Sequence, residues 1–469
     1  MSLNPESRIL NPRAAHLIGV CGSGMRSLAE LLVDRGWRVS GSDAAAEGHN
    51  AAMLCARGVE LHAGHAAGFV ADADEVVFSP AVPATNPERV AARERGIPEH
   101  SYPQALGRLM SGRTGVAIAG THGKSTTTAM LGWILESAGQ SPSVICGGEL
   151  LNRNAGGWSG SGAAVVVEAC EYQGSFFNLA PRHAALLDIE PDHFDCYADL
   201  DSAIAAYRAF VAQLPAEGLL VCRADRPAVG TAVAGAAARV ETFGVETSAD
   251  WTAHRVRLRP GQTSFRIERH GQAWADCVLH VPGEHNVLNA VAAVALAAEL
   301  GVGPDAVRQA LADFRGVRRR CERLGSWRGV ELVDDYAHHP TAVAATLAAV
   351  RAEFPGRPIR CVFQPHQVSR TRTLMAELAD SFREADHILL LPVYSAREAA
   401  GDHVTASQEL LHKLKGAGRR AMFVPSLDRL VAVLETDARP GEVVLLIGAG
   451  DIDRVRDELS RRIPRHYAS

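Results

Sequence analysis

The chain has 469 residues, of which 47% are hydrophobic and 22% charged, and its formal net charge is −5. This length predicts two to four domains with ample cores, in an ordinary soluble protein. The slight negative charge gives no reason to expect nucleic acid or an anionic membrane surface as a partner. Nine cysteines without a Cys-x-x-Cys pair indicate reduced thiols. Residues 1–11 lack the apolar core of a signal peptide, and no apolar run of 18 residues occurs, so we expect a cytoplasmic protein without membrane contact.

The first hundred residues alternate predicted strands and helices. The expected elements are a strand over 16–22, a helix over 25–35, strands over 37–42 and 75–78, and a helix from 86. A glycine turn that includes Gly22 and Gly24 joins the first strand to the first helix, and Asp43 follows the second strand. This arrangement resembles a dinucleotide-binding fingerprint, in which the acid binds a ribose hydroxyl. The glycine spacing is not the standard one, so a tightly packed β-α-β unit without a ligand remains an alternative.

Residues 119–128, Ala-Gly-Thr-His-Gly-Lys-Ser-Thr-Thr-Thr, follow a short apolar strand and precede a helix expected to end near Ser137. This is the layout of a phosphate-binding loop, although the general signature has a glycine where Ile118 stands. Lys124 would reach the outer phosphates, and the Ser125 hydroxyl can ligate Mg²⁺. The alternative is a turn that only caps the helix. We favour the nucleotide site, because a plain turn needs neither the charge nor the hydroxyls and the chain has only three lysines.

The remaining chain predicts two further domains. In the central one we expect strands over 163–167, 183–189 and 218–222, a helix over 199–214, solvated antiparallel strands over 241–282 and an Ala-rich helix from 283, with residues 147–162 too irregular for any element. In the third we expect strands over 330–333, 359–363, 387–391, 421–424 and 443–447, and helices that include one over 372–385. The arginine-rich run 315–320 is typical of a charged linker.

Strands that alternate with helices predict α/β domains with mainly parallel, doubly wound sheets. We expect three such domains, at 1–106, 107–316 and 317–469. In sheets of this kind ligands gather at the carboxyl ends of the strands, which is where the unusual polar residues fall.

Two polar residues near the phosphate loop are candidate metal ligands. Glu168 ends the predicted strand over 163–167, and His193 lies in an acidic loop after the next strand. A carboxylate at the end of a core strand beside a phosphate loop is well placed for Mg²⁺. We favour metal binding for both residues, and helix capping for Asp195 and Asp199.

Four motifs together resemble the Mur ligase family, the ATP-dependent amide ligases that build the peptidoglycan stem peptide. The motifs are Gly120-Thr-His-Gly-Lys-Ser-Thr-Thr, Glu168-Ala-Cys-Glu171, Gly283-Glu-His-Asn-Val-Leu-Asn289 and Asp334-Asp-Tyr-Ala-His-His-Pro340. The family's loop is shorter than the general phosphate loop, which accounts for Ile118. The chain departs from the family at Cys170, where Asp is common, and at Gln367-Val368, where Arg-Tyr is common.

The resemblance implies a Rossmann-like N-terminal domain for a UDP-sugar, a phosphate-loop ATPase-like central domain for ATP and Mg²⁺, and a Rossmann-like C-terminal domain for an amino acid. Gln364-Pro365-His366 and Ser369-Arg370-Thr371 imply UDP-N-acetylmuramate and L-alanine as substrates. A substrate carboxylate would attack the γ-phosphate of ATP, and an amino group would capture the acyl phosphate. Both steps develop charge on oxygens, so cations and backbone donors contribute most. We expect a monomer or a weak homodimer.

The resemblance also implies roles for individual residues. ATP would be bound by Gly120, Thr121, His122, Gly123, Lys124, Ser125, Thr126, Asn286, Arg320 and Asp335, and Mg²⁺ by Ser125, Glu168 and His193. The substrates would be bound by Gly22, Ser23, Gly24, Met25, Asp43, His65, Ser79, His366 and Arg370. The catalytic residues would be Lys124, His193, His338 and Arg370.

Three other functions compete with this interpretation. The ligase that reattaches recycled murein tripeptide shares most motifs but looks different at 364–371. A nucleotide-sugar dehydrogenase or epimerase would fit the first domain alone, and the phosphate loop and the lack of a Tyr-x-x-x-Lys pair oppose it. A regulatory ATPase with a partner-binding third domain is opposed by the polar clusters at 334–340 and 364–372, which suit chemistry better than a binding face.

Overall fold

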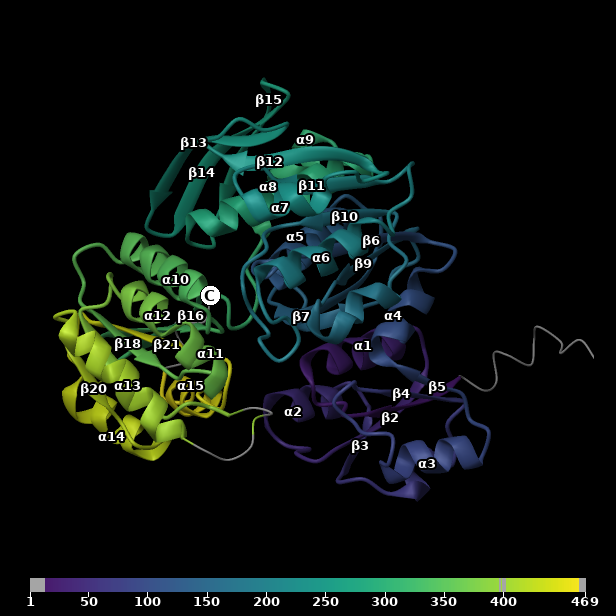
Figure 1. Ribbon diagram of the computed structural model, residues 1–469, viewed down its shortest axis with the longest axis horizontal. Helices are drawn as coiled ribbons and strands as arrows, with labels where there is room; N and C mark the ends of the chain where they lie inside the picture. The colour runs from purple at the N-terminus through teal and green to yellow at the C-terminus, as the bar shows by residue number, and fades with distance from the viewer. Residues whose placement is uncertain (1–12, 396–397, 399–401, 464–469) are drawn as a thin grey trace, which may run out of the picture.

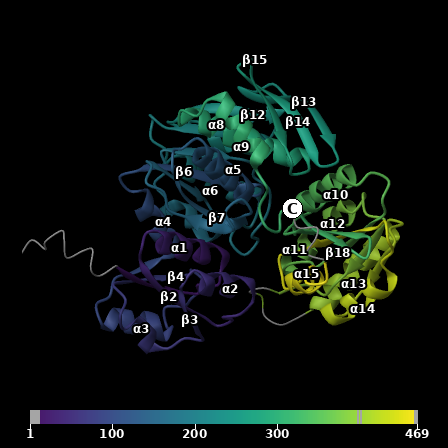
Figure 2. The same ribbon diagram turned by 180° about the vertical axis from the view of Figure 1, so that it is seen from behind.

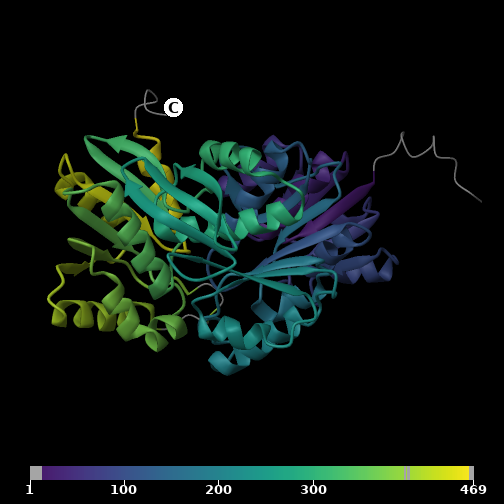
Figure 3. The same cartoon turned by 90° about the horizontal axis from the view of Figure 1, so that it is seen from above.

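The computed structural model describes residues 13–395, 398 and 402–463, which form three α/β domains with one sheet each (Figure 1). The predicted fold class, three mainly parallel and doubly wound sheets, is confirmed. Seen from above, the purple N-terminal domain and the green-to-yellow C-terminal domain lie on opposite sides of the teal central domain (Figure 3). Residues 1–11, where we predict no signal peptide, lie outside the described residues. No helix in the described ranges is long and apolar enough to cross a membrane.

The N-terminal domain has a five-stranded parallel sheet in the order β3-β2-β1-β4-β5. Its elements are β1 (Ala14–Ile18), α1 (Ser23–Asp34), β2 (Arg38–Asp43), α2 (Gly48–Ala56), β3 (Glu60–Ala63), η2 (Ala67–Val70), β4 (Glu75–Phe78), α3 (Pro87–Glu94) and β5 (Glu99–Ser101). β1 ends earlier than predicted because Gly19, with a φ of 80°, turns the chain. The predicted domain end at 106 falls inside α4 (Tyr102–Met110), which leads into the central domain.

The central domain has a ten-stranded sheet in the order β15-β14-β13-β12-β11-β10-β6-β9-β7-β8. Its elements are β6 (Thr114–Ala119), α5 (Lys124–Ser137), β7 (Ser143–Leu150), β8 (Ala155–Trp158), β9 (Ala164–Glu168), η3 (Tyr172–Asn178), β10 (His183–Leu186), α6 (Leu200–Val211), β11 (Leu219–Arg223), α7 (Pro227–Val233), β12 (Arg239–Val245), β13 (Trp251–Arg259), β14 (Gln262–Arg269), β15 (Gln272–Leu279), α8 (Glu284–Glu299) and α9 (Pro304–Asp313). The antiparallel strands β13, β14 and β15 confirm the prediction for most of 241–282. It is wrong at the start of that range, because β12 pairs in parallel with both β11 and β13. The Ala-rich helix α8 is buried against α5.

The prediction that residues 147–162 form no element is wrong, because β7 and β8 form an antiparallel pair there. The glycines of β8 permit a close contact with α1 of the N-terminal domain. The backbone N–H groups of Gly156 and Gly157 donate to Glu30 of α1 at 2.8 and 2.9 Å. A Cβ at Gly157 would overlap the carbonyl oxygen of Ser27. The packing of the two domains therefore requires the glycines of β8, and these same glycines make β8 resemble a loop in the sequence.

We expect Gly157→Ala to lower the free energy of unfolding by about 1–3 kcal/mol, the usual cost of overpacking a tight contact. The midpoint of thermal denaturation measures this change. Gly230→Ala is the matched control, because Gly230 lies in α7 with no heavy atom within 4 Å of the added Cβ. That variant should be neutral or slightly stabilising. Equal midpoints for the two variants would contradict the packing argument.

The C-terminal domain has a six-stranded sheet in the order β16-β17-β21-β18-β19-β20, in which only β16 is antiparallel to its neighbour. Its elements are β16 (Glu322–Trp327), β17 (Val330–Asp335), α10 (Pro340–Glu353), β18 (Ile359–Phe363), α11 (Val368–Thr373), α12 (Met375–Ser381), β19 (His387–Leu390), α13 (His403–Gly416), β20 (Ala421–Phe423), α14 (Leu427–Asp437), β21 (Val443–Ile447) and α15 (Asp453–Ser460). Figure 2 shows β13 and β14 of the central domain above α10. The N–H of Gly261, between these two strands, donates to Glu353 of α10 at 2.9 Å.

The single helix predicted over 372–385 is wrong, because α11 and α12 are separate helices that meet at Leu374. Leu374 has a φ of −101° and a ψ of 25°, which breaks the helix. Leu374 and Met375 are consecutive and both are buried in the same core. A continuous helix would point these two side chains in directions about 100° apart, and the break allows both to be buried.

The arginine run at 315–320 joins two domains, as expected of a linker, but two of its arginines are held in place. Arg319 donates to the carbonyl oxygen of Gly448 at 2.7 Å. The guanidinium of Arg320 lies 4.8 Å from the ring centre of Tyr336 and donates to the Ser125 hydroxyl at 3.3 Å. These residues are therefore more than a charged linker: Arg319 is held within the C-terminal domain, and Arg320 connects that domain to the phosphate loop.

Candidate active site

The candidate site lies where the loops after β6, β9 and β10 of the central domain meet those after β17 and β18 of the C-terminal domain. β10 ends three residues earlier than predicted, at Leu186, and residues 187–190 turn toward the loop after β6. There the backbone N–H of His122 donates to Asp188 at 2.9 Å. Across the domain boundary, the Thr341 hydroxyl donates to Glu190 at 2.6 Å. Residues from two domains thus surround the phosphate loop.

The loop over 120–125 has the backbone that a phosphate loop requires. Gly120 has a φ of 135°, and Gly123 has a φ of 79° at the N-cap of α5. A Cβ at Gly123 would overlap the side-chain oxygen of Asn289 on α8, so only glycine fits there. Ser125 and Thr126 are buried in the first turn of α5. Because the N-terminus of a helix presents backbone N–H groups and positive potential, this turn is suited to an anion.

Lys124 is held inside the site by a carboxylate that we did not predict. Its ammonium group donates to both oxygens of Glu171, at 2.9 and 3.1 Å, and to the carbonyl of Gly120 at 2.5 Å. Burial alone would lower the pKa of Lys124, but the Glu171 carboxylate outweighs burial and raises it. Lys124 therefore carries a fixed positive charge beside the phosphate loop.

The three predicted Mg²⁺ ligands lie around the same loop. The Glu168 carboxylate accepts from the Gly147 N–H at 2.7 Å, and the Ser125 hydroxyl accepts from Arg320. Nε2 of His193 lies 3.6 Å from Glu171, and its Nδ1 is buried without a hydrogen-bond partner among the described residues. Burial lowers the pKa of His193, although Asp192 opposes this. A neutral imidazole with an unpartnered nitrogen is suited to a cation.

The prediction that Asp195 and Asp199 are helix caps is confirmed for Asp199 only. The Asp199 carboxylate accepts from the Ser202 N–H at 2.8 Å and forms a capping box at the start of α6. Asp195 instead accepts a hydrogen bond from the hydroxyl of Tyr172 at 2.9 Å.

Arg370 forms a buried ion pair with an acid of the central domain. Nε of Arg370 donates to Asp192 at 2.8 Å, and a terminal nitrogen lies 2.6 Å from the same carboxylate oxygen. The other terminal nitrogen donates to Nδ1 of His366 at 3.0 Å. Burial alone would raise the pKa of Asp192, but Arg370 holds it well below its usual range. Burial and then Arg370 lower the pKa of His338, whose ring lies 5.5 Å from that of His366.

Asn286, Arg320 and Asp335 lie close to the boundary between the central and C-terminal domains. A cavity of about 240 Å³ there is lined by Arg320, Pro282, Gly316, Cys321 and Phe354, among others. The amide of Asn286 donates to the Pro282 carbonyl at 2.7 Å. Asp335 accepts from the backbone N–H groups of Cys321 and Ala337 at 2.6 and 2.7 Å. Burial raises the pKa of Asp335, although Arg320 opposes this.

The predicted substrate residues of the first domain gather at the carboxyl ends of its strands. Gly22 is the N-cap of α1, which begins with Ser23, Gly24 and Met25. Asp43 accepts from the Cys21 N–H at 3.0 Å and so fixes this turn.

Ser79 and His65 lie beside the same turn. A Cβ at Gly19 would lie 3.0 Å from that of Ser79. Nδ1 of His65 lies 3.2 Å from the Ser42 hydroxyl and 3.3 Å from Glu88. Burial alone would raise the pKa of Glu88, but its hydrogen bonds lower it.

Several charged residues at the domain boundaries were not among the predicted site residues. They are Glu171, Asp188, Glu190, Asp192 and His339. Glu171 and His339 belong to two of the motifs on which the family resemblance rests, but no contact was predicted for them. The signal for the other three was that they occur in the polar segment 188–195, just after a buried strand.

Comparisons with known proteins cover nearly all of the chain. Three models of the Mur ligase family match in succession, its catalytic domain at 14–114, its middle domain at 118–297 and its glutamate ligase domain at 319–450. The chain is 41% identical to the UDP-N-acetylmuramate–L-alanine ligase of Salinibacter ruber, over 95% of this chain and 94% of that protein.

Two solved structures are also similar to the whole chain. The UDP-N-acetylmuramate–alanine ligase of Thermotoga maritima has a TM-score of 0.80 and 28% identity, and the match covers 96% of this chain and 98% of that one. A murein peptide ligase of Psychrobacter arcticus has a TM-score of 0.71 and 26% identity, with 97% and 100% covered.

Proposed function

The chain belongs to the Mur ligase family, and from this premise we infer that it is an ATP-dependent ligase that joins L-alanine to the carboxylate of UDP-N-acetylmuramate in peptidoglycan precursor synthesis. The observation that carries this inference is the similarity to alanine ligases along the whole chain, through all three domains. The bond formed is an amide, and the energy comes from ATP. Because ATP and UDP-activated precursors are cytoplasmic metabolites, we expect the enzyme to act there, as a monomer or a weak homodimer.

We propose that the loop over 120–126 binds the phosphates of ATP. Its backbone N–H groups and the start of α5 would accept the negative charge, and Lys124 would neutralise the outer phosphates. The pairing of Lys124 with Glu171 supports this role, because it keeps a charged ammonium group at the loop. Asn286, Arg320 and Asp335 would contact the nucleotide from the boundary with the C-terminal domain.

Mg²⁺ fits the residues proposed for it. Ser125 and Glu168 offer the oxygens that this cation prefers. Nδ1 of His193 is buried without a hydrogen-bond partner among the described residues, while Nε2 of the same ring lies 3.6 Å from Glu171. Mg²⁺ bound there would neutralise charge on the phosphate oxygens. Ser125, Glu168 and His193 would hold it, and Arg320 would orient the Ser125 hydroxyl.

The C-terminal domain would supply the amino acid. The attacking amine must be neutral, so a group that takes its proton is required. His338 is the candidate for this task, because its Nδ1 lies 3.0 Å from the Tyr336 carbonyl and so carries the proton, which leaves Nε2 able to accept one. Arg370 would bind the amino-acid carboxylate, for which a planar guanidinium is geometrically matched. His366 accepts a hydrogen bond from Arg370 and so helps to orient it.

The test is the mass of the product after incubation with UDP-N-acetylmuramate, ATP, Mg²⁺, a mixture of amino acids and the murein tripeptide. We expect the alanyl product and phosphate release that requires both the sugar acid and L-alanine. A tripeptide adduct would identify the recycling ligase instead. Phosphate release without either substrate would indicate a regulatory ATPase. In a parallel incubation with NAD⁺, oxidation of the sugar with reduction of the cofactor would indicate a dehydrogenase.

We expect Glu168→Ala and His193→Ala each to raise the Mg²⁺ concentration that gives half-maximal activity, because each deletes a proposed ligand. Titration of Mg²⁺ at saturating ATP measures the change. Asp195→Asn is the matched control, since this nearby acid contacts Tyr172 and is not a proposed ligand. An unchanged Mg²⁺ dependence in both variants would remove these residues from the metal site.

A further inference from the structure

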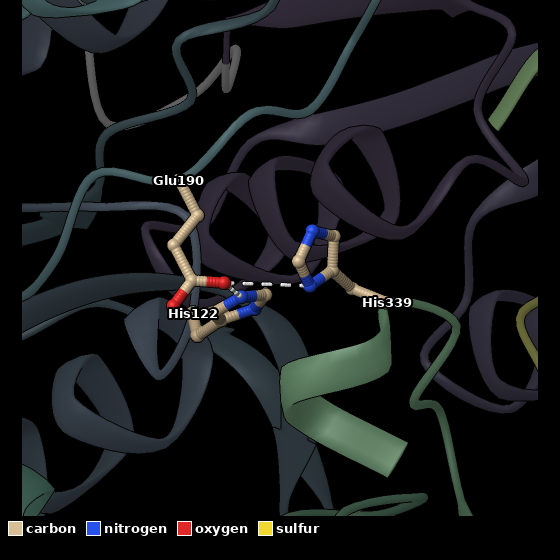
Figure 4. A group of neighbouring side chains, drawn as sticks. All are labelled: His122, Glu190 and His339. Carbon is tan, nitrogen blue, oxygen red and sulfur yellow. Dashed lines mark hydrogen bonds and ion pairs between the residues drawn. The ribbon is translucent and has the colours of Figure 1, made fainter. Parts of the chain in front are cut away.

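Two histidines and a glutamate from three separate segments meet between the phosphate loop and the C-terminal domain (Figure 4). His122 comes from the phosphate loop, Glu190 from the loop after β10, and His339 from the N-cap of α10. Their candidate ligand atoms all lie within 4.8 Å of one another, and this is the one such group of three within the described ranges.

Two distances in this group, both from the Glu190 carboxylate, are close to those of a small tetrahedral metal site. Ligand atoms at about 2.0–2.1 Å from a tetrahedral zinc ion lie about 3.3–3.4 Å from each other. Oε2 of Glu190 lies 3.2 Å from Nε2 of His122 and 3.5 Å from Nδ1 of His339. A hydrogen bond explains the first distance without a metal, so the second distance is the informative one.

The contacts of His339 leave two hydrogen-bond acceptors facing each other, Nδ1 of His339 and the carboxylate of Glu190. Its Nε2 lies 3.2 Å from the carbonyl oxygen of Pro191, which can only accept, so this nitrogen carries the proton. Nδ1 then presents its lone pair to the Glu190 carboxylate, with only a long contact of 3.4 Å from the Thr341 N–H. Burial lowers the pKa of His339, which favours the neutral ring. A lone pair that faces a carboxylate in this way is stabilised by a cation placed between them.

The surrounding contacts are those that commonly orient metal ligands. Metal-bound histidines usually donate their other N–H to a backbone carbonyl, as His339 does to Pro191. The Thr341 hydroxyl donates to Glu190 at 2.6 Å and fixes its carboxylate. The side chains of His122 and Glu190 are 21% and 18% exposed, so an ion from solvent can reach them.

We propose that His122, Glu190 and His339 form a binding site for a divalent cation of the zinc class, in addition to the Mg²⁺ site of the proposed function. Two imidazole nitrogens and one carboxylate oxygen suit Zn²⁺, Co²⁺ or Ni²⁺, whereas Mg²⁺ prefers oxygen ligands. Binding displaces the proton shared between His122 and Glu190, and water would complete a four-coordinate shell.

The site would couple cation binding to the arrangement of the domains. Two ligands belong to the central domain and the third begins α10 of the C-terminal domain, so all three meet only when these domains lie as they do here (Figure 4). By linkage, a cation bound there stabilises this arrangement. A zinc-class cation would therefore oppose any movement that separates these two domains.

The test is titration of the metal-free full-length protein with Co²⁺, whose visible absorption is strong in four-coordinate sites and weak in octahedral ones. We expect the wild-type protein with Co²⁺ to show a strong visible band and to lack the near-ultraviolet absorption of a cobalt–thiolate bond. Addition of Zn²⁺ should abolish the visible band. Glu190→Gln and His339→Asn should raise the Kd for Co²⁺ by at least about 100-fold, beyond the 10- to 100-fold typical of outer-shell partners. Asn keeps a good N-cap for α10, so folding of the second variant is preserved.

Two controls separate this site from others. His254→Ala should leave the band unchanged, although His254 also lies between two carboxylates, at 3.1 Å from Glu246 and 3.7 Å from Glu268. His193→Ala, which alters the proposed Mg²⁺ site, should also leave it unchanged. Hydrogen exchange of residues 337–341 gives a second measurement. Zn²⁺ should slow this exchange in the wild type and should not slow it in Glu190→Gln or His339→Asn. A Co²⁺ band that survives both Glu190→Gln and His339→Asn, or no band in the wild type, would overturn the proposal.

Discussion

Replacing Lys124 with Ala is expected to reduce ligase turnover by about 100- to 1000-fold, because one charge contact to the reacting phosphates is worth about 3–4 kcal/mol. The ammonium group of Lys124 lies at the start of α5 among the backbone groups that would bind the phosphates. The measurement is the release of phosphate in the presence of both the sugar acid and L-alanine. An enzyme that keeps a tenth of its activity would rule out the phosphate-loop interpretation.

We also expect this substitution to lower the stability of the fold, an effect not usually expected of a lysine in a loop. Glu171 is buried, and its partner is Lys124, so Lys124→Ala leaves a buried carboxylate without a counterion. Breaking a buried pair in this way costs about 3–5 kcal/mol. The matched control is the double variant Lys124→Gln with Glu171→Gln, which removes both charges and keeps both shapes.

We expect the double variant to recover most of the denaturation midpoint and none of the turnover. If turnover returned together with stability, Lys124 would be a structural partner of Glu171 and not a phosphate ligand. The single variant alone cannot separate these two roles, because it removes the charge and the ion pair together.

Elements in which an apolar run was bounded by polar residues could be predicted closely from the sequence. β4, β18 and β21 begin and end at the predicted residues, since each is a short buried run in a parallel sheet. β8 was missed because its glycines, which permit contact with α1, resemble a loop in the sequence. The break at Leu374 was missed because only the core shows that two consecutive apolar side chains must be buried together.

In the candidate site, the sequence indicated which residues are unusual but not which ones meet. The glycine and lysine pattern of the phosphate loop predicts local backbone geometry, and that geometry is present. Which side chains form ion pairs could not be predicted in this way, because that depends on how distant segments and domains pack. Lys124 and Glu171 are 47 residues apart in sequence, and Asp192 and Arg370 are 178 apart. Interpretation of Arg370 from its own motif could not reveal that a buried acid of another domain already contacts it.

That contact makes the role of Arg370 the most informative one to test. We expect Arg370→Lys to raise the KM for L-alanine by about 10- to 100-fold, or roughly 1.4–3 kcal/mol, because an ammonium group cannot bind a carboxylate through two parallel hydrogen bonds. The KM values for ATP and for the UDP-sugar should barely change. Gln367 and Val368, which follow His366, are uncharged, so neither of these positions supplies a cation that shares the task. The measurement is steady-state kinetics with each substrate varied in turn.

The competing role for Arg370 is to hold the C-terminal domain against the central one through Asp192. Three N–H groups of its guanidinium contact Asp192 and His366, and the side chain is only 3% exposed. If this were its main role, Arg370→Lys would raise the KM values for L-alanine, ATP and the UDP-sugar by similar factors. Asp192→Asn, which removes the other half of the ion pair, would also raise all three. Arg372→Lys is the matched control, because Arg372 is 42% exposed and pairs with the surface acids Asp402 and Glu409. Suppose that Arg370→Lys raises only the KM for L-alanine and that Arg372→Lys leaves all three KM values unchanged. This result would assign recognition of the amino acid to Arg370, and Asp192 would then be the residue that positions Arg370.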